Sequence, residues 1–554
     1  MTPTTSTTPD ELVGSFDVIV IGAGINGVGI ARDAAARGLR VALLEQRDIC
    51  SGVSAWSGRL IHGGLRYLEH YDVPLVRESL RERERLFRLA PHLVKPEWLL
   101  MPFYKHNRRP PWLIRLGMIT YDVLSMDKKA SHHKILRGSQ TLVRFPGIGR
   151  DGLTGAAAFI DGQVELAERL CVELAVAAQA DGAVVRTRAQ VDAPLLEGGR
   201  VVGVRFTDTE DGSVHEVRGS VVVNVAGPWI DQVFAAETLG TAPPQPRLNE
   251  GTKGSHVVVD KFPGAPSDVV YYESRADGRL VLVIPWCGRY MLGTTDIRVE
   301  GDPDDARCDA DEVDYILGEV NSLVPQANLT PDDVLYTMSG VRPLPHVPDV
   351  KDTSAIPRSH VLHDHGEGLE NLVTVVGGKL TTYRQLAEDV VDDALRRLGR
   401  PKTPTTTRTT PFPGARTTDL ARFGRDFVRT AGLPEASAQR LVDVYGTRAP
   451  EVLVTIRSVH GLDEVVDPRT GTLAGELVFA VDHEMARSLT DVLARRTMLA
   501  FEPGHVLDRV EQVADVLAEH LGWDDTERKA QIEDYRTWLQ RLAVPSRDPQ
   551  TVGA

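Results

Sequence analysis

The stretch FDVIVIGAGINGVGIARDAAARG, residues 16–38, has the features of a strand, a tight turn and a helix in immediate succession. Its first six residues form a near-continuous apolar run of β-branched character, which is typical of a strand buried on both faces of a parallel sheet. The alanine-rich segment that ends at Gly38 is typical of a helix. A second apolar run, residues 41–44, follows. This order predicts an α/β region at the beginning of the chain.

The turn at residues 22–27 matches the pattern G-x-G-x-x-G of dinucleotide-binding folds. Gly22 permits the tight turn, Gly24 lets the backbone approach a pyrophosphate, and Gly27 lets the helix pack closely on the strand. The N-terminus of the helix offers free N–H groups to phosphates. Glu45, at the end of the second strand, is placed to accept hydrogen bonds from ribose hydroxyls. The sequence therefore predicts a dinucleotide site, and this motif alone fits FAD and NAD equally.

Composition and charge limit the class of protein. With 554 residues the chain exceeds one hydrophobic core, so we expect two or three domains. The formal net charge of −14 argues against nucleic-acid binding. The four cysteines lie far apart without a C-x-x-C pair, so we expect no disulfide framework, no metal site and a cytoplasmic location. Residues 1–15 are polar and lack basic residues, which predicts a disordered tail rather than a signal peptide.

Beyond residue 60 strands and helices alternate irregularly, which extends the α/β region to residue 399. Further expected strands are 184–191, 200–206, 220–225, 280–284 and 372–376, with a helix at 164–180. The Pro/Thr-rich stretch 400–415 predicts an extended, solvated linker. Helical patterns then predict a helical domain over residues 416–545, with helices at 420–431, 436–445, 485–499 and 506–521.

A second glycine-containing stretch, RLIHGGLRY at residues 59–67, gathers two arginines, a histidine and a tyrosine. Its glycine pair allows the backbone to approach a flat ring closely. Arg66 carries a planar guanidinium suited to phosphate or carboxylate, and His62 can take a proton near neutral pH. An isolated histidine would more often only bond backbone in a turn, but these neighbours favour a site.

Three later stretches have the same character: KGSH at 253–256, GVRPL at 340–344 and GGKLTT at 377–382. Arg358 and the turn GTTD at 293–296 add to them. Bringing several cations together is unfavourable unless a shared anion neutralises them. We therefore expect one anionic ligand between these segments.

Eight of these motifs stand in an order that resembles a known family. They are GAGINGVG, RLIHGGLRYLEH, NVAGPW at 224–229, KGSH, IPW at 284–286, GTTD, SGVRPL and GGKLTTYR. In this order they resemble the FAD-dependent glycerol-3-phosphate dehydrogenases, strongly over residues 16–390 and more weakly through the helical part. The segment SAWSGR at 54–59 departs from the family, which usually has a Ser/Thr-rich stretch followed by lysine there.

The resemblance implies a fold and a reaction. The fold is α/β, with a glutathione-reductase-like FAD-binding domain interleaved with an antiparallel-sheet substrate domain, as in D-amino-acid oxidases, and a C-terminal α-helical domain. The reaction is oxidation of sn-glycerol 3-phosphate to dihydroxyacetone phosphate by hydride transfer to FAD, with electrons passed to a membrane quinone. An oxidase of the same family that uses dioxygen is the first alternative. A member of the wider fold that acts on amino acids is the second, and the many cations argue against it. A flavoprotein without turnover is the third.

The corresponding site residues fall into three groups. The residues expected to bind and orient the substrate are Arg66, Tyr67, Arg342, Arg358 and Lys379. The base is either His62 or His256, and Arg342 completes the catalytic set. The residues expected at the cofactor are Gly22, Gly24, Ile25, Asn26, Gly27, Glu45, Ser54, Ser57, Arg59, Leu60, His62, Val191, Gly378, Lys379, Leu380 and Thr381. The N–H groups of Leu380 and Thr381, at the start of the next helix, are expected to stabilise reduced flavin.

Residues 105–144 carry nine lysines and arginines against two aspartates, and include the apolar run PPWLIRLGMI. Such a mixture suits docking on anionic lipid headgroups, and a core helix with a solvated basic face is the alternative. A quinone acceptor favours peripheral contact with the inner face of the cell membrane. The helical domain is expected either to mediate a homodimer or to cover the FAD-binding domain.

Overall fold

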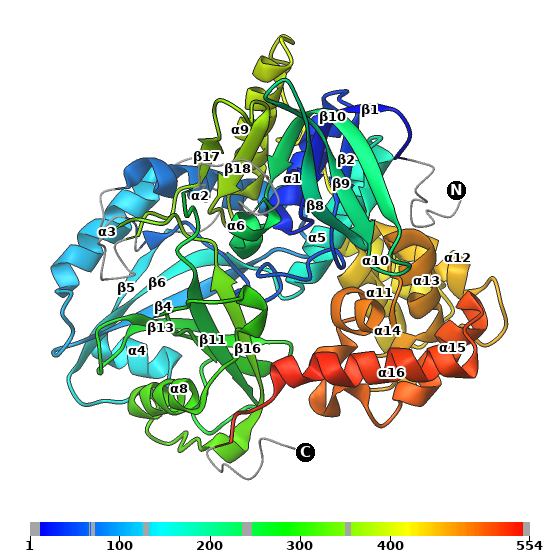
Figure 1. Ribbon diagram of the computed structural model, residues 1–554. Helices are drawn as coiled ribbons and strands as arrows, with labels where there is room; N and C mark the ends of the chain where they lie inside the picture. The colour runs from blue at the N-terminus through cyan, green and yellow to red at the C-terminus, as the bar shows by residue number, and fades with distance from the viewer. Residues whose placement is uncertain are drawn as a thin grey trace.

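The computed structural model describes residues 12–65, 67, 72–125, 132–234, 246–348 and 356–546. It has three parts (Figure 1). A sheet flanked by helices lies at the top of the view, a second large sheet lies at lower left, and a helical part lies at lower right. The cavity that contains the candidate site is formed between the two sheets.

The first sheet is mainly parallel. Its strands lie in the order β17 (Val361–Asp364), β18 (Leu372–Val376), β10 (Val214–Asn224), β1 (Ser15–Ile21), β2 (Val41–Leu44) and β7 (Val184–Arg186). The strands from β18 to β7 run parallel, and β17 is antiparallel at the edge. A ribbon of β8 (Ala189–Glu197) and β9 (Arg200–Asp208) pairs with β10.

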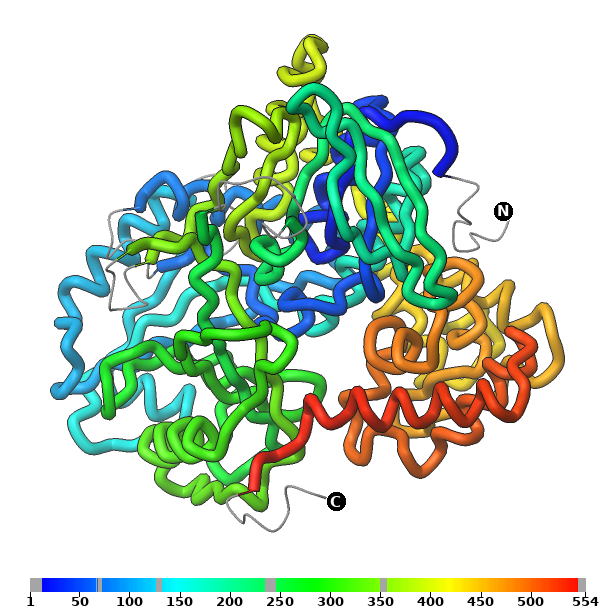
Figure 2. Tube along the Cα trace, viewed as in Figure 1, coloured from blue at the N-terminus to red at the C-terminus, as the bar shows by residue number. Residues whose placement is uncertain are grey.

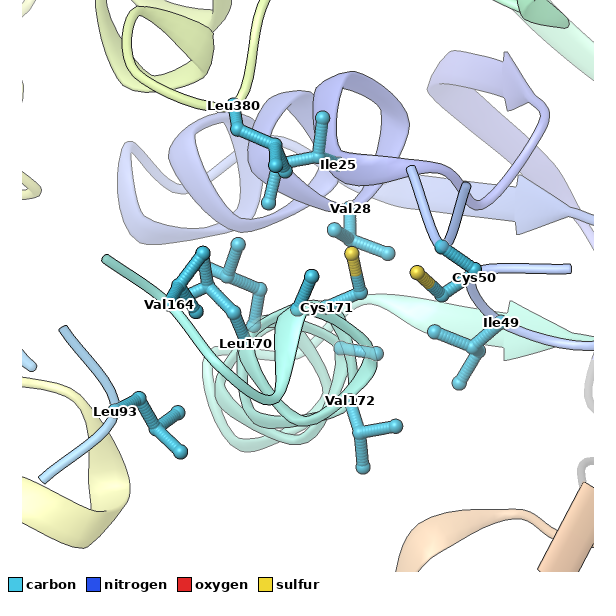
Figure 3. Packing of buried hydrophobic residues seen from close by; sticks show 14 of the residues in the cluster. Ile25, Val28, Ile49, Cys50, Leu93, Val164, Leu170, Cys171, Val172 and Leu380 are labelled. Carbon is cyan, nitrogen blue, oxygen red and sulfur yellow. The ribbon is translucent and has the colours of Figure 1, made fainter. Parts of the chain in front are cut away.

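Alternate residues of β1 face two different cores, which explains why residues 18–21 are all apolar. Val18 and Val20 pack in the cluster that includes α1 (Ile25–Ala36), whereas Ile19 and Ile21 pack in the cluster that includes the β8–β9 ribbon. The helices α5 (Ala167–Ala180) and α9 (Tyr383–Arg397) lie against α1. Figure 3 shows this packing around α5, where Cys50 and Cys171 are buried among aliphatic side chains.

The second sheet is mainly antiparallel. Its strands lie in the order β15 (Ile297–Arg298), β11 (Thr252–Val259), β14 (Arg289–Gly293), β13 (Leu280–Trp286), β12 (Val269–Glu273), β4 (Lys95–Tyr104), β6 (Leu153–Gln163) and β3 (Leu60–Ile61). In addition β16 (Val334–Arg342) pairs with β11, and β5 (Lys134–Arg137) pairs with β6. Further helices of this region are α2 (Val73–Leu89), α3 (Pro111–Leu124), α4 (Gly138–Arg144) and α8 (Ala310–Leu323). The short helix α6 (Ile230–Val233) lies against β8 and β18 of the first sheet.

The chain passes back and forth between the two sheets. It forms β1 and β2 in the first, β3 to β6 in the second, β7 to β10 in the first, β11 to β16 in the second, and β17 and β18 in the first. This confirms the predicted interleaving of a cofactor-binding α/β unit with an antiparallel-sheet unit. One expected strand is divided: residues 184–191 form β7 and β8, because Arg188 between them has a left-handed φ of 60°.

The helical part follows residue 415. It contains α10 (Leu420–Thr430), α11 (Glu435–Tyr445), α12 (Ala449–Ile456), α13 (Ala474–Glu484), α14 (Leu489–Asp491), α15 (Val510–Leu521) and α16 (Asp525–Leu539), with a small sheet of β19 (Val465–Asp467) and β20 (Thr472–Leu473). The helix expected at 485–499 is wrong. Met485 ends α13 in a left-handed conformation, and Val492–Arg496 is a π-helical turn.

The C-terminal segment connects the helical part to the second sheet. Figure 2 shows α16, in red, crossing between them. At its end the Thr337 hydroxyl on β16 donates a hydrogen bond to the carbonyl of Ala543 at 2.9 Å. In the described part of the chain no helix is both long and apolar enough to cross a bilayer.

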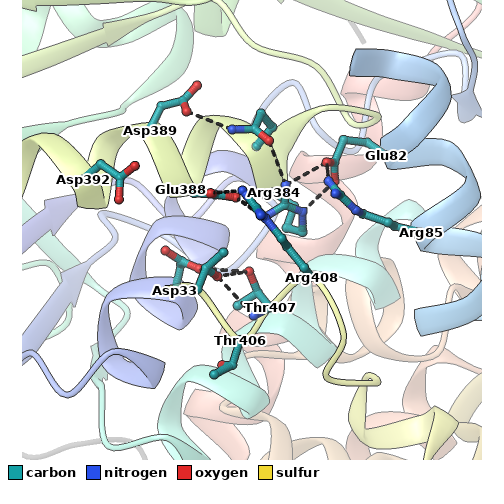
Figure 4. Close-up of polar contacts among 12 residues, drawn as sticks. Asp33, Glu82, Arg85, Arg384, Glu388, Asp389, Asp392, Thr406, Thr407 and Arg408 are labelled. Carbon is teal, nitrogen blue, oxygen red and sulfur yellow. Dashed lines mark hydrogen bonds and ion pairs between the residues drawn. The ribbon is translucent and has the colours of Figure 1, made fainter. Parts of the chain in front are cut away.

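The predicted linker at 400–415 lacks helix and strand until Pro413, but its side chains fix it to the first sheet's helices (Figure 4). Thr407 donates to Asp33 of α1 at 2.9 Å, and Arg408 pairs with Glu388 of α9. Phe412 is fully buried. The segment contains a turn, in which the N–H groups of Thr409 and Thr410 donate to the carbonyl of Thr406, and it is anchored to these helices rather than only solvated.

Candidate active site

The glycine turn at residues 22–27 lies at the carboxyl end of β1 and leads into α1. Gly22 has a φ of +103°, which L side chains rarely adopt. A Cβ on Gly27 would lie 1.8 Å from the carbonyl oxygen of Gly22, so only glycine allows the helix this position. Gly24 borders the cavity between the sheets. The turn therefore presents bare backbone and the N-terminus of α1 to the cavity.

Glu45 follows β2 beside this turn and is buried. Its carboxylate accepts hydrogen bonds from the N–H of Ala23 at 2.7 Å and of Arg47 at 2.9 Å. Burial raises the pKa of Glu45, and these two N–H groups partly offset the rise. Glu45 borders the cavity, and an ionised carboxylate with two N–H donors keeps acceptor capacity for ribose hydroxyls.

One cavity of about 450 Å³ brings together segments from the whole α/β region. It is lined by most of the residues that the sequence assigned to the site: Gly22, Gly24, Ile25, Asn26, Glu45, Ser54, Ser57, Arg59, Leu60, His62, Tyr67, Val191, His256, Arg342, Arg358, Gly378, Lys379, Leu380 and Thr381. Gly27 packs behind the turn and does not line the cavity. Arg66 lies outside the described residues.

The segment with the unusual sequence, residues 54–59, packs under the glycine turn. Ser54 Oγ accepts a hydrogen bond from the N–H of Ile25 at 3.1 Å, and Ser57 donates to the carbonyl of Ser54 at 3.2 Å. Arg59 is fully buried, and its guanidinium donates to both carboxylate oxygens of Glu168 at 2.6 and 2.7 Å. The Arg59 side chain is thus committed to an ion pair and is not a free cation for an anionic cofactor.

His62 lies on a backbone segment held from two sides. Its N–H donates to Thr381 Oγ1 at 3.1 Å, and the N–H of Gly63 donates to the hydroxyl of Tyr121 at 3.0 Å. Tyr121 in turn donates to Asp161, whose oxygens lie 2.7 and 2.8 Å away. Burial lowers the pKa of His62, although Asp161 opposes the shift. The imidazole is therefore neutral at pH 7 and able to accept a proton.

His256 lies in β11, between β14 and β16, and is buried at the cavity wall. Neither ring nitrogen has a hydrogen-bond partner among the described residues. Burial, with the positive charges of Arg342 and Arg59, lowers the pKa of His256 to about 3. Like His62, it is a neutral imidazole facing the cavity, so both base candidates remain.

A cluster of arginines surrounds Asp296 at one end of the cavity. Its carboxylate lies 3.0 Å from Arg342, 3.7 Å from Arg358 and 4.0 Å from Arg279. Burial alone would raise the pKa of Asp296, but the three guanidinium groups lower it. Arg342 also donates to Thr294 Oγ1 at 3.0 Å. Asp296 therefore holds three cations together while neutralising only one of them.

Lys379 is the fourth cation at this end. Its ammonium lies 3.9 Å from the centre of the Tyr67 ring and has no hydrogen-bond partner among the described residues. Burial lowers the pKa of Lys379 to about 7. The preceding Gly377 and Gly378 have φ of +87° and +108°. A buried ammonium without a partner at a cavity wall indicates an anionic ligand.

The helix after this stretch begins later than expected. α9 starts at Tyr383 with Thr382 as its N-cap, so Leu380 and Thr381 precede its first turn. Both residues still border the cavity.

Three residues near the site were not predicted: Tyr121, Asp161 and Arg279. Asp161 lies in the otherwise apolar run AAAFID of β6, and a lone carboxylate in such a strand is a signal for a buried partner. Arg279 directly follows Gly278, as Lys379 directly follows Gly378. Among the described residues no group of three or more His, Cys, Asp or Glu side chains could hold a metal ion.

Sequence comparison identifies two matching families. The family described as FAD dependent oxidoreductase matches residues 17–384, and the C-terminal domain of alpha-glycerophosphate oxidase matches residues 405–528. A glycerol-3-phosphate dehydrogenase of Synechocystis sp. is 41% identical over 96% of this chain and 97% of its own. An aerobic glycerol-3-phosphate dehydrogenase of Staphylococcus epidermidis is 31% identical over 97% of this chain and 96% of its own.

The fold has a matching crystal structure. The glycerol-3-phosphate dehydrogenase of Bacillus halodurans, complexed with FAD, superimposes with a TM-score of 0.78 at 27% identity, covering 97% of this chain and 98% of that one. The cavity suits the same cofactor. The space beside Gly24 is open, since a Cβ there would meet only Ser54 Oγ, at 3.3 Å, and Glu45 borders the same cavity. The cofactor of this protein is FAD. The chain belongs to the family of FAD-dependent glycerol-3-phosphate dehydrogenases.

Proposed function

We propose that this protein oxidises sn-glycerol 3-phosphate to dihydroxyacetone phosphate and passes the electrons to a membrane quinone. The observation that supports this substrate is the excess of positive charge at one end of the cavity. Arg279, Arg342, Arg358 and Lys379 border it with Asp296 as the carboxylate among them. A phosphate dianion would neutralise this excess. The names of the relatives at 41% and 31% identity support the same substrate.

Arg342 is the principal anchor for the phosphate in this proposal. Asp296 and Thr294 fix its guanidinium, so little side-chain entropy is lost when substrate binds. Arg358 and Arg279 add charge near the other oxygen of the same carboxylate. With the phosphate held, the secondary alcohol of a three-carbon substrate has one restricted position in the cavity.

When bound, FAD supplies the acceptor for the hydride that leaves C2 of the substrate. His62 or His256 takes the hydroxyl proton, since each is a neutral imidazole at the cavity wall. Lys379, partly protonated at pH 7, stabilises negative charge that develops on the substrate oxygen. Substitution of each histidine by asparagine separates the two candidates. Only the variant that lacks the base should lose the fall in activity at acid pH.

The proposed quinone acceptor requires contact with a membrane, and α3 is the surface proposed for it. Four of its apolar side chains are more than half exposed, with exposed fractions of 65% for Trp112, 54% for Leu116, 54% for Ile119 and 53% for Val123. Exposed basic residues lie on α3 and in the segments before and after it: Lys105, Arg108, Arg115, Lys134 and Arg137. Lys128 and Lys129 lie outside the described residues. Apolar residues flanked by cations match an anionic lipid surface.

The reaction is tested by anaerobic reduction of the purified holoenzyme. Addition of sn-glycerol 3-phosphate should bleach the flavin absorbance, and a soluble quinone should restore it within seconds. Air should restore it far more slowly. Rapid recovery in air with release of peroxide would instead identify an oxidase, and flavin that never bleaches would overturn the substrate.

The surface is tested by sedimentation with vesicles of phosphatidylcholine and phosphatidylglycerol. The double variant Leu116→Glu/Ile119→Glu should lose binding at least tenfold. Val454→Glu is the matched control, because Val454 is 71% exposed on α12 of the helical part. Equal binding by the double variant and the wild type would remove α3 from the proposal.

A further inference from the structure

The turn that follows β2 is held by the helical part of the molecule. Asp48, in this turn, is fully buried. Its carboxylate accepts two hydrogen bonds from Arg496, at 2.8 and 2.9 Å, and one from Arg495 Nε at 2.5 Å. These partners are more than 440 positions away in the sequence, since the separations are 447 and 448. The contact therefore joins the first sheet to the C-terminal region.

A local irregularity lets two consecutive arginines reach one carboxylate. In a regular α-helix neighbouring residues point in different directions. Here Val492–Arg496 forms a π-helical turn. Arg495 also pairs with Asp491, and Arg496 Nε donates to the carbonyl of Glu484 at 2.8 Å. Both guanidinium groups are thus held by partners other than Asp48. π-helical turns often mark functional positions.

Asp48 is connected to the cofactor end of the cavity by the turn itself. The N–H of Ser51 donates to the Asp48 carbonyl at 3.1 Å, and the Ser51 hydroxyl lies 3.4 Å from Glu45. The N–H of Cys50 donates to the carbonyl of Ala23 in the glycine turn at 3.0 Å. Glu45 and Ser51 border the cavity. A displacement of Asp48 would therefore move the carboxylate assigned to the ribose.

A second buried ion-pair cluster joins the same two regions, but its carboxylate does not contact the Glu45 turn; it meets the first cluster only through the backbone carbonyl of Glu484. Glu484 of α13 pairs with Arg169 of α5 and with Arg448, and all three side chains are at most 4% exposed. None of the three borders the cavity. The two ion-pair clusters are alike in burial and in the regions they join, but only the Asp48 cluster includes the turn that carries Glu45.

We propose that Asp48, Arg495 and Arg496 are positioning residues for FAD, through which the helical part holds the Glu45 turn in its binding geometry. The helical part is then a component of the cofactor site, although no residue of it touches the cavity. This role depends on the cofactor and not on the substrate or electron acceptor proposed above.

The test compares Asp48→Asn with Glu484→Gln, two isosteric losses of a buried charge. Both holoenzymes are diluted, and release of FAD is followed by the rise of flavin fluorescence. We expect Asp48→Asn to raise the Kd for FAD at least tenfold, and Glu484→Gln to change it less than twofold. Both substitutions should lower the melting temperature of the holoenzyme. With excess FAD, Asp48→Asn should recover a kcat close to that of the wild type.

Two results would overturn the proposal: equal FAD release by the two variants, or retention of FAD by Asp48→Asn as in the wild type. If Asp48→Asn does not yield folded holoenzyme, Arg496→Lys is measured by the same criteria. It keeps the charge and loses the two-point contact with Asp48. Substrate is absent from the FAD measurement, so failure of the proposed reaction would leave this result unaffected.

Discussion

The two ends of the cavity are built in different ways. The nucleotide end is mostly backbone: the glycine turn at 22–27, the N-terminus of α1 and a single carboxylate, Glu45. The substrate end is mostly charged side chains, with three arginines around Asp296 and a buried Lys379. The nucleotide end is built mainly from one stretch of sequence that includes the glycine turn and Glu45. The substrate end is assembled from strands and loops of both sheets.

This difference determines how each end can fail. The nucleotide end depends on shape, because a glycine Cβ has no room between packed backbone segments. The substrate end depends on charge balance, because its cations are held near one another by one acid. Substitutions at the first should affect cofactor and fold together, whereas substitutions at the second should affect catalysis and leave the cofactor bound.

The largest effect is expected for Gly27→Ala. Its Cβ would lie 1.8 Å from the Gly22 carbonyl oxygen, so α1 must move away from β1. We expect a loss of about 3 kcal/mol in stability and purification without flavin. Gly318→Ala is the control, because Gly318 is an exposed position of α8 and nothing lies within 4 Å of the added Cβ. It should stabilise the protein by about 0.5–1 kcal/mol. If Gly27→Ala retained its flavin, cofactor binding at the nucleotide end would not depend on the close packing of α1 against the glycine turn.

The next effect is expected for Arg342→Gln. Removal of this guanidinium should lower kcat/KM by roughly a thousandfold, or about 4 kcal/mol, because it loses a charged contact in a buried site. The flavin spectrum and FAD affinity should not change. Arg200→Gln is the control: Arg200 pairs with Glu370 at the surface, is 66% exposed and should have no effect on turnover. Loss of flavin from Arg342→Gln would show that the two ends are not separable.

The same difference explains what could be predicted from sequence. The glycine turn and Glu45 were predicted from residues alone, because their function depends on local backbone geometry and fixed spacing. The eight ordered motifs then predicted the interleaved fold, which the strand order confirms. The substrate end could be predicted only as a set of cations, since no local pattern shows which strands become neighbours.

The features that the sequence did not reveal share one property. Arg59 was predicted at the cofactor and lines the cavity, but its guanidinium pairs with Glu168, more than a hundred positions away. Asp161 and Tyr121 hold Gly63 from β6 and α3. The π-helical turn at 492–496 was read as part of a regular helix. Each depends on a tertiary partner distant in sequence, which periodicity and spacing cannot identify.

A smaller effect is expected for Asp296→Asn. The amide keeps the shape of the carboxylate but no longer orients Arg342, Arg358 and Arg279. The site becomes more positive, so substrate binding should not weaken, while the less ordered anchor should lower kcat about tenfold. Steady-state kinetics separates the two parameters. A raised KM with unchanged kcat would mean that Asp296 serves binding alone.

The last effect concerns pH and belongs wholly to the substrate end. Burial lowers the pKa of Lys379 to about 7, so its positive charge is present below pH 7 and is lost as pH rises through that value. Because kcat/KM reports the free enzyme, it should fall above pH 7 with a slope approaching about tenfold per pH unit. In Lys379→Arg the side chain stays protonated throughout the measured pH range. The fall of kcat/KM above pH 7 should therefore disappear, even if the absolute rate is lower. The flavin content of Lys379→Arg, measured at pH 6 and pH 9, is the control. If the fall persists in Lys379→Arg, another group titrates at this end of the cavity, and the unpaired ammonium does not set the charge that the substrate meets.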